Sequence, residues 1–169
     1  MKTVTEQLST YAAYHRDRRN IVSHFFGIPL IVVAVATLLG RTELLPGLTP
    51  ATLVTALCIA YYFMLEHTLA LAMAVFMGVA LWLGHWLASG SQALWLTSGV
   101  GLFVTGWAIQ FVGHFWEGRK PAFVDDLMQL AIGPLFIVAE WLFALGLLPA
   151  LAAEIERRAG PVRGAGTHA

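Results

Sequence analysis

Four long apolar segments constrain the fold of this chain more than any other feature of its sequence. They cover Ile21–Leu39, Thr68–Leu87, Ala93–Val112 and Leu130–Leu148, while a fifth segment, Ala51–Leu65, is shorter. A helix needs roughly 20 apolar residues to cross a bilayer, and the four longer segments satisfy that requirement. Because the backbone in lipid must bond within its own segment, we expect each of these segments to be helical.

Composition supports a membrane protein and argues against a soluble domain. Hydrophobic residues make up 58% of the chain, charged residues only 12%, and the mean hydropathy is +0.71. Soluble domains carry about a quarter charged residues. The net charge is zero, so we expect no nucleic-acid partner, and the single cysteine, Cys58, excludes a disulfide framework. We therefore predict an all-α, polytopic bundle of about five membrane helices.

The two ends of the chain differ from this bundle. Apolar residues in Thr5–Tyr14 recur at spacings of three and four, which predicts an amphipathic helix on the membrane surface. Asn20 is placed to cap the first membrane helix. We expect one membrane-embedded domain over residues 1–150 and a polar, disordered tail over residues 151–169, where Gly160 and Pro161 occur.

Positive charge predicts the orientation in the membrane. Arg16, Arg18 and Arg19 precede the first apolar segment, which favours a cytoplasmic N-terminus. This would be the cytoplasmic side of the plasma membrane in a bacterium, or of the endoplasmic reticulum in a eukaryote. If all five segments cross, four histidines fall on this same side: His15, His24, His67 and His114.

Two polar clusters flank the apolar segments, one at residues 14–24 and one at residues 110–126. His15 and His24 are nine residues apart and would point in opposite directions on one straight helix, so we expect a break at Arg18–Asn20. His114 and Glu117 share a helix face. Histidines with a carboxylate are the ligand set of non-haem Fe(II) oxygenases, although imidazoles near a membrane surface also serve as ordinary hydrogen-bonding groups.

Several other polar residues have more than one interpretation. Glu140 falls near mid-bilayer depth, where it would either support a site or fix helix packing. Asp125, four residues before Gln129, would cap the last membrane helix or orient a ligand histidine. Arg119 and Lys120 are ordinary cytoplasmic cations, or they hold the carboxylate of an amphiphile. His85 lies among tryptophans and is expected to be an interfacial anchor.

The two polar clusters resemble the 2-hydroxy fatty acid dioxygenase family, small membrane proteins of fatty acid alpha-oxidation. The resemblance spans the chain up to about Leu148. It rests on Tyr14, His15, Asn20, His24, Pro29, Trp107, Gln110–His114, Glu117, Pro121, Ala122, Asp125, Gln129, Pro134 and Glu140. It implies an Fe(II) enzyme whose iron ligands are His15, His24 and His114. Glu117 or Asp125 would support the ligands catalytically, with Asn20, Gln110, Gln129 and Glu140 around them.

The same resemblance implies the reaction. A long-chain 2-hydroxy fatty acid and O₂ would give the acid one carbon shorter. Apart from the resemblance, our own hypothesis is that Arg119 and Lys120 steer the head group. A slot between helices would measure the acyl chain, since each buried CH₂ contributes roughly 0.8 kcal/mol. Two other classes of protein stay open: a cytochrome with haem between His24 and His114, and a non-catalytic lipid-binding or transport protein.

Overall fold

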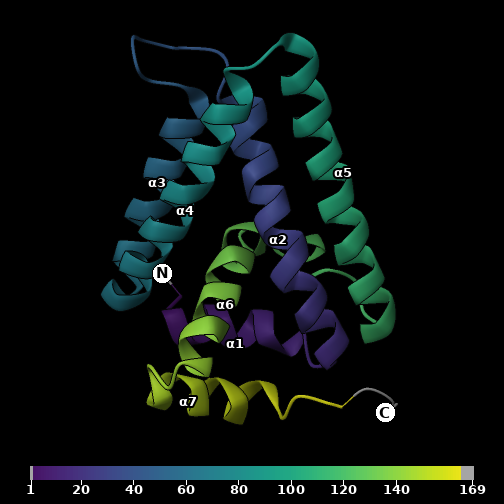
Figure 1. The fold of residues 1–169 in the computed structure, drawn as a ribbon. Helices are drawn as coiled ribbons and strands as arrows, with labels where there is room; N and C mark the ends of the chain where they lie inside the picture. Colours follow the sequence, from purple (N-terminus) through teal and green to yellow (C-terminus); the bar gives the residue numbers. More distant parts are fainter. Residues whose placement is uncertain (1, 165–169) are drawn as a thin grey trace. The chain divides into compact units, whose positions relative to one another are not determined.

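The computed structural model describes residues 2–164, and within them the chain is entirely helical, as predicted. Figure 1 shows the elements in order: α1 (Val4–Ala13), α2 (Arg18–Leu39), α3 (Pro50–Leu65), α4 (His67–Ala88), α5 (Gln92–Glu117), the 3₁₀ helix η1 (Ala122–Val124), α6 (Gln129–Ala144) and α7 (Pro149–Ala159). The chain does break between two helices, but at residues 14–17, which include His15, and not at Arg18–Asn20, which belong to α2.

The chain divides into two compact units, and a single membrane-embedded domain over residues 1–150 stays a prediction. One unit combines the two ends of the chain, up to Phe26 and from Ile109 on, and we call it the terminal unit. The other, Gly27–Ala108, is the central unit. Helices α2 and α5 each contribute residues to both units. All of the residues predicted to form the site belong to the terminal unit.

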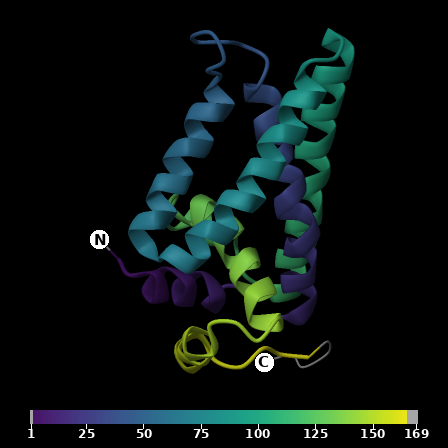
Figure 2. The ribbon, with the colours of Figure 1, turned by 60° about the vertical axis from the view of Figure 1, so that its left-hand side comes forward.

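In the central unit, α3 and α4 pack side by side as a helical hairpin (Figure 2). Only Glu66 separates the two helices, and its carboxylate accepts the Leu69 N–H at 2.6 Å to cap α4. Small residues permit a second close packing, because a side chain at Gly84 would overlap Ala36 of α2. The central unit is therefore held mainly by apolar contacts between closely packed helices.

Three helices are long and apolar enough to cross a membrane: α2, α4 and α5. The shorter helices α3 and α6 have 16 residues each, which corresponds to about 24 Å at 1.5 Å per residue. The predicted segment Leu130–Leu148 is thus not one continuous helix, since α6 stops at Ala144 and Leu148 adopts a left-handed backbone with φ 53°. Within residues 2–164, α2, α4 and α5 satisfy both length and composition, and a crossing by α3 and α6 stays a prediction.

In the terminal unit, α1 packs against both α6 and α7, and Figure 1 shows α1 and α7 running across the axis of α6. Thr3 and Glu6 form a capping box at the start of α1, as the predicted N-terminal helix requires. We expected a disordered tail over residues 151–169, but residues 149–159 form α7 and its Ile155 is buried. Residues 165–169 lie outside the described part of the chain.

Candidate metal centre

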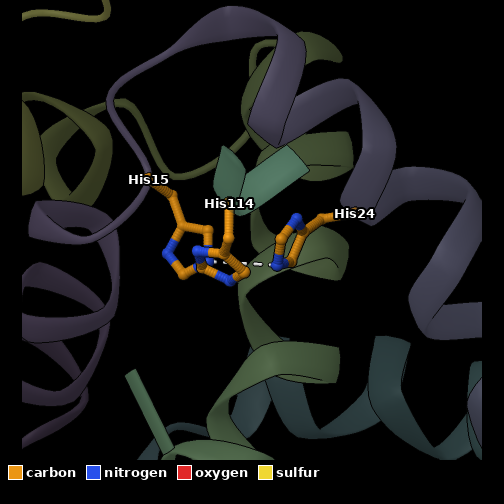
Figure 3. A group of neighbouring side chains, drawn as sticks. All are labelled: His15, His24 and His114. Carbon is orange, nitrogen blue, oxygen red and sulfur yellow. Dashed lines mark hydrogen bonds between the residues drawn. The ribbon is translucent and has the colours of Figure 1, made fainter. Parts of the chain in front are cut away.

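Three histidine side chains converge in the terminal unit (Figure 3). His15 comes from the loop after α1, His24 from the second turn of α2, and His114 from the last turn of α5. Their potential ligand nitrogens all lie within 4.8 Å of one another, and the three side chains are buried. His67 and His85 lie in the central unit and are not part of this group.

Backbone carbonyls fix the tautomers of two of these rings. The Nδ1 atom of His15 lies 2.7 Å from the Tyr11 carbonyl oxygen, and the Nδ1 atom of His24 lies 2.8 Å from the Asn20 carbonyl oxygen. A carbonyl oxygen only accepts, so each Nδ1 carries the hydrogen and donates it. In the neutral rings, both Nε2 atoms therefore present lone pairs.

Those two Nε2 atoms face each other at 3.1 Å. Two lone pairs at this distance repel unless a proton or a metal cation lies between them. Burial keeps the pKa of His15 well below its usual value, and the neighbouring His24 lowers it further, which disfavours the proton. Metal–imidazole bonds of about 2.1 Å place two ligand nitrogens about 3 Å apart at a right angle, so the observed geometry fits a metal ion.

Local packing sets the orientation of these rings. Tyr11 stacks on His15 with ring centroids 4.1 Å apart and planes 7° from parallel. Gly113, the residue before His114, lies so close to α2 that a Cβ atom there would overlap the Ser23 hydroxyl and the Asn20 side chain. Glycine at this position therefore allows the last turn of α5 to approach the first turns of α2.

Glu117 lies one turn after His114, but its carboxylate binds the protein rather than joining the histidine group. Its Oε1 accepts from Arg163 Nη2 at 2.7 Å. Its Oε2 accepts from the Asp17 backbone N–H at 2.7 Å and from Asn20 Nδ2 at 3.1 Å. Both oxygens are thus engaged, and the side chain is only 1% exposed.

We expected Asn20 to cap α2 from its position, but it does not. Asp17 does so instead, because its Oδ1 accepts the Arg19 backbone N–H at 2.8 Å. The side-chain amide of Asn20 is therefore free to donate to Glu117. The backbone carbonyl of Asn20 accepts from His24. Asn20 therefore connects the carboxylate directly to a ring of the cluster.

The Asp125 side chain does not cap α6, and among the described residues it hydrogen-bonds no histidine ring. Its carboxylate accepts from the Tyr14 hydroxyl at 2.7 Å and pairs with Lys120, whose hydrogen bond is the main reason that the pKa of Asp125 is lowered. Arg119 donates to the Ala13 carbonyl at 3.0 Å. The three residues thus fix the segment immediately before His15, and all of them are at least partly exposed to solvent.

The remaining predicted residues do not hydrogen-bond the rings of the cluster, within the part of the chain that the structure describes. Gln129 is buried and donates to Gln7 Oε1 at 3.3 Å rather than pairing with Asp125. Gln110 lies one turn before His114, is 4% exposed, and its Oε1 has no hydrogen-bond partner. Glu140, partly buried in α6, contributes its charge to the surroundings of Arg16.

A surface pocket of about 430 Å³ is lined by Arg18, Arg19, Val22, Ser23 and Trp116. Arg19 stacks over the Trp116 ring at 5.5 Å, and Ser23 adjoins His24 in sequence. We had interpreted the two arginines only as signals of orientation. The alternation of cations with apolar residues at the start of α2 could have indicated an amphiphile site, whereas nothing in the sequence marked Asp17 or Arg163.

Comparison with known proteins yields two matches. The family model described as 2-hydroxy-palmitic acid dioxygenase Mpo1-like matches residues 1–145. The chain is also 33% identical over 152 residues to a protein of Saccharomyces cerevisiae named 2-hydroxy-palmitic acid dioxygenase MPO1, covering 89% of this chain and 86% of the yeast protein. No solved structure matches significantly.

Proposed function

This chain belongs to the Mpo1-like family, and on that premise we propose that it is a membrane dioxygenase of long-chain 2-hydroxy fatty acids. O₂ is the second substrate, and the products are the fatty acid one carbon shorter, CO₂ and water. The observation that carries the proposal is the pair of Nε2 atoms of His15 and His24 facing each other at 3.1 Å. A buried pair of acceptors next to a third imidazole supports a bound metal cation, since burial disfavours the proton.

His15, His24 and His114 would hold Fe(II). Imidazole suits iron as well as other first-row metals, and three protein ligands leave coordination positions for a substrate that chelates through its carboxylate and hydroxyl oxygens. When bound, the ion would supply Lewis acidity and a redox-active centre for O₂, and the 2-hydroxy acid itself would supply the electrons that reduce O₂.

The protein's own residues prepare this centre. The Tyr11 and Asn20 carbonyls hold two rings in the tautomer that offers Nε2, an arrangement common among metal-binding histidines. Burial of all three rings excludes bulk water from the cluster. We assign Glu117 and Asp125 to positioning, since Glu117 fixes the start of α2 and Asp125 holds Tyr14 beside His15.

Cations at the edge of the terminal unit would bind the substrate head group. Arg119 and Lys120 are candidates by charge, and their side chains extend from the loop after α5. Arg18 and Arg19 are further candidates, because they line an apolar-walled pocket adjoining Ser23 and so combine charge with a surface for an acyl chain. We propose that the centre lies at the cytoplasmic face of the membrane, where an amphiphile enters sideways.

Metal analysis and oxygen uptake test this function together. Detergent-purified protein is expected to contain iron and to consume O₂ with 2-hydroxypalmitate but not with palmitate, and His114→Ala should abolish both iron binding and uptake. A Soret absorption band would identify a cytochrome instead. Metal-free protein that binds both acids equally and consumes no O₂ would identify a lipid-binding protein.

A further inference from the structure

The segment Gly160–Gly164, here called the strap, follows α7 and lies against the loop that carries His15. We propose that the strap positions the histidine cluster, and that Arg163 does so through Glu117. The inference rests on the proposed function for its consequence in metal binding. The structural connection itself is independent of the metal.

Backbone and side-chain hydrogen bonds fasten the strap to the loop. The Arg163 N–H donates to the Arg16 carbonyl at 2.7 Å, and the Arg18 N–H donates to the Arg163 carbonyl at 3.2 Å. Arg16 completes the connection, because its Nη1 donates to the Gly160 carbonyl at 2.6 Å while its Nε donates to the Ala12 carbonyl at 2.7 Å. The loop between α1 and α2 is therefore held between the end of α1 and the strap.

The side chain of Arg163 reaches further, to the buried carboxylate of Glu117. The distance from Nη2 to Oε1 is 2.7 Å, and the Glu117 side chain is 1% exposed while that of Arg163 is 33% exposed. A carboxylate this deeply buried is costly unless a cation and further donors compensate it. Arg163 is the cation that hydrogen-bonds it, and Asp17 and Asn20 supply the other donors.

One carboxylate thus ties together all three histidine-bearing elements. Glu117 follows His114 on α5 by one turn, and it accepts from Asp17, two residues after His15. It also accepts from Asn20, whose carbonyl holds His24. Without Arg163 the carboxylate would carry an uncompensated charge. Its hydrogen bonds to Asp17 and Asn20, and its own position on α5, would then be free to shift. A shift at any of them moves a potential ligand.

The strap is a feature of this chain beyond its family match, which ends at residue 145. The resemblance therefore assigns no role to Arg163, and its contacts alone carry the inference. Arg163 touches no ring of the cluster, so it is a positioning residue and not a ligand.

The test compares three substitutions in the full-length protein, with Co(II) as a spectroscopic metal probe. Arg163→Ala should weaken Co(II) affinity by about 10- to 100-fold, the usual effect of losing a group that orients metal ligands. Arg163→Lys, which keeps a cation, should recover part of that loss. Arg157→Ala is the matched control, since Arg157 also pairs with a glutamate, Glu154, but is exposed. The Co(II) affinity of this variant should equal that of wild type.

A double substitution tests whether Arg163 acts through Glu117. Adding Glu117→Gln to Arg163→Ala should change Co(II) affinity little further, because two residues of one network are not additive. Unchanged Co(II) affinity and absorption spectrum in Arg163→Ala, even with a lowered Tm, would show a merely structural role and overturn the proposal.

Amide hydrogen exchange on the metal-free protein separates this inference from the proposed function. Arg163→Ala should accelerate exchange at residues 14–18, and Arg163→Lys gives the same comparison if the alanine variant does not fold. Wild type that binds neither Fe(II) nor Co(II) would refute the proposed function and leave this exchange test intact. Equal exchange in variant and wild type would refute the strap's role.

Discussion

Histidines in the two units are satisfied in different ways. In the central unit, His85 Nε2 lies 3.0 Å from the Thr49 hydroxyl, which can donate or accept and so suits either tautomer of the ring. In the terminal unit, His15 and His24 both spend their Nδ1 hydrogen on carbonyls, and their Nε2 atoms oppose each other. The identity of the partner atoms, rather than the presence of a histidine, distinguishes a candidate metal ligand from a packing residue.

The glycines of the two units show the same contrast. Gly84 allows an apolar approach to Ala36, whereas Gly113 allows a polar approach to Ser23 and Asn20. Close packing therefore serves helix association in the central unit and the placement of His114 in the terminal unit. Matched substitutions in the two units separate these roles.

The largest difference is expected between His24→Ala and His85→Ala. His24→Ala removes a proposed ligand, so Fe(II) or Co(II) should no longer raise the Tm and O₂ uptake should fall below detection. His85→Ala loses one hydrogen bond, worth about 1 kcal/mol, and should keep metal binding. Thermal unfolding with and without metal measures both effects. A metal-induced rise in Tm that survives in His24→Ala would contradict the ligand assignment.

Gly113→Ala and Gly84→Ala should destabilise the protein similarly but differ in their effect on the metal. Each introduces a Cβ into a tightly packed contact, with an expected cost of about 1–3 kcal/mol. Only Gly113→Ala should also weaken Co(II) affinity, because it pushes the end of α5 away from Ser23. Gly101→Ala, on the same helix but in open space, is the control for helix propensity. Equal Co(II) affinities in the two destabilised variants would remove the contrast.

The smallest effect is expected from two arginines that each stack on a tryptophan. Arg19 lies over Trp116 at 5.5 Å in the terminal unit, and Arg41 lies over Trp95 at 5.3 Å in the central unit. Arg19→Ala should raise KM for 2-hydroxypalmitate about two- to fivefold, as expected for one partly exposed charge, with kcat nearly unchanged. Arg41→Ala should leave both constants at their wild-type values. A KM of Arg19→Ala identical to that of wild type would show that the pocket does not bind the head group.

Sequence reasoning anticipated the elements of the site better than its connections. The nine-residue spacing of His15 and His24 predicted a break between two helices, and α1 does end before α2 begins. Apolar length predicted helices throughout, but not that α6 would stop at Ala144. The apolar pattern does not reveal such a break, because residues 145–148 are three leucines and one glycine, as apolar as the helix before them.

The partners of Glu117 were beyond prediction. Its spacing from His114 suggested a ligand, yet three donors from distant positions occupy the carboxylate, and one of them follows it by 46 residues. The glycine and proline near Arg163 predicted disorder. That prediction missed the contacts of Arg163, because composition carries no information about tertiary hydrogen bonds. The ring tautomers likewise depend on which carbonyls lie nearby, which only coordinates reveal.

The ion pair between Glu117 and Arg163 also has a consequence for biosynthesis. Glu117, which follows all three histidines, is translated 46 residues before the arginine that secures it. At roughly 5–20 residues per second, this leaves an interval of roughly 2–9 s. Iron that binds in that interval would bind while the loop between α1 and α2 is not yet fixed by Arg163. Synthesis of Arg163 would then fix this loop around the bound ion.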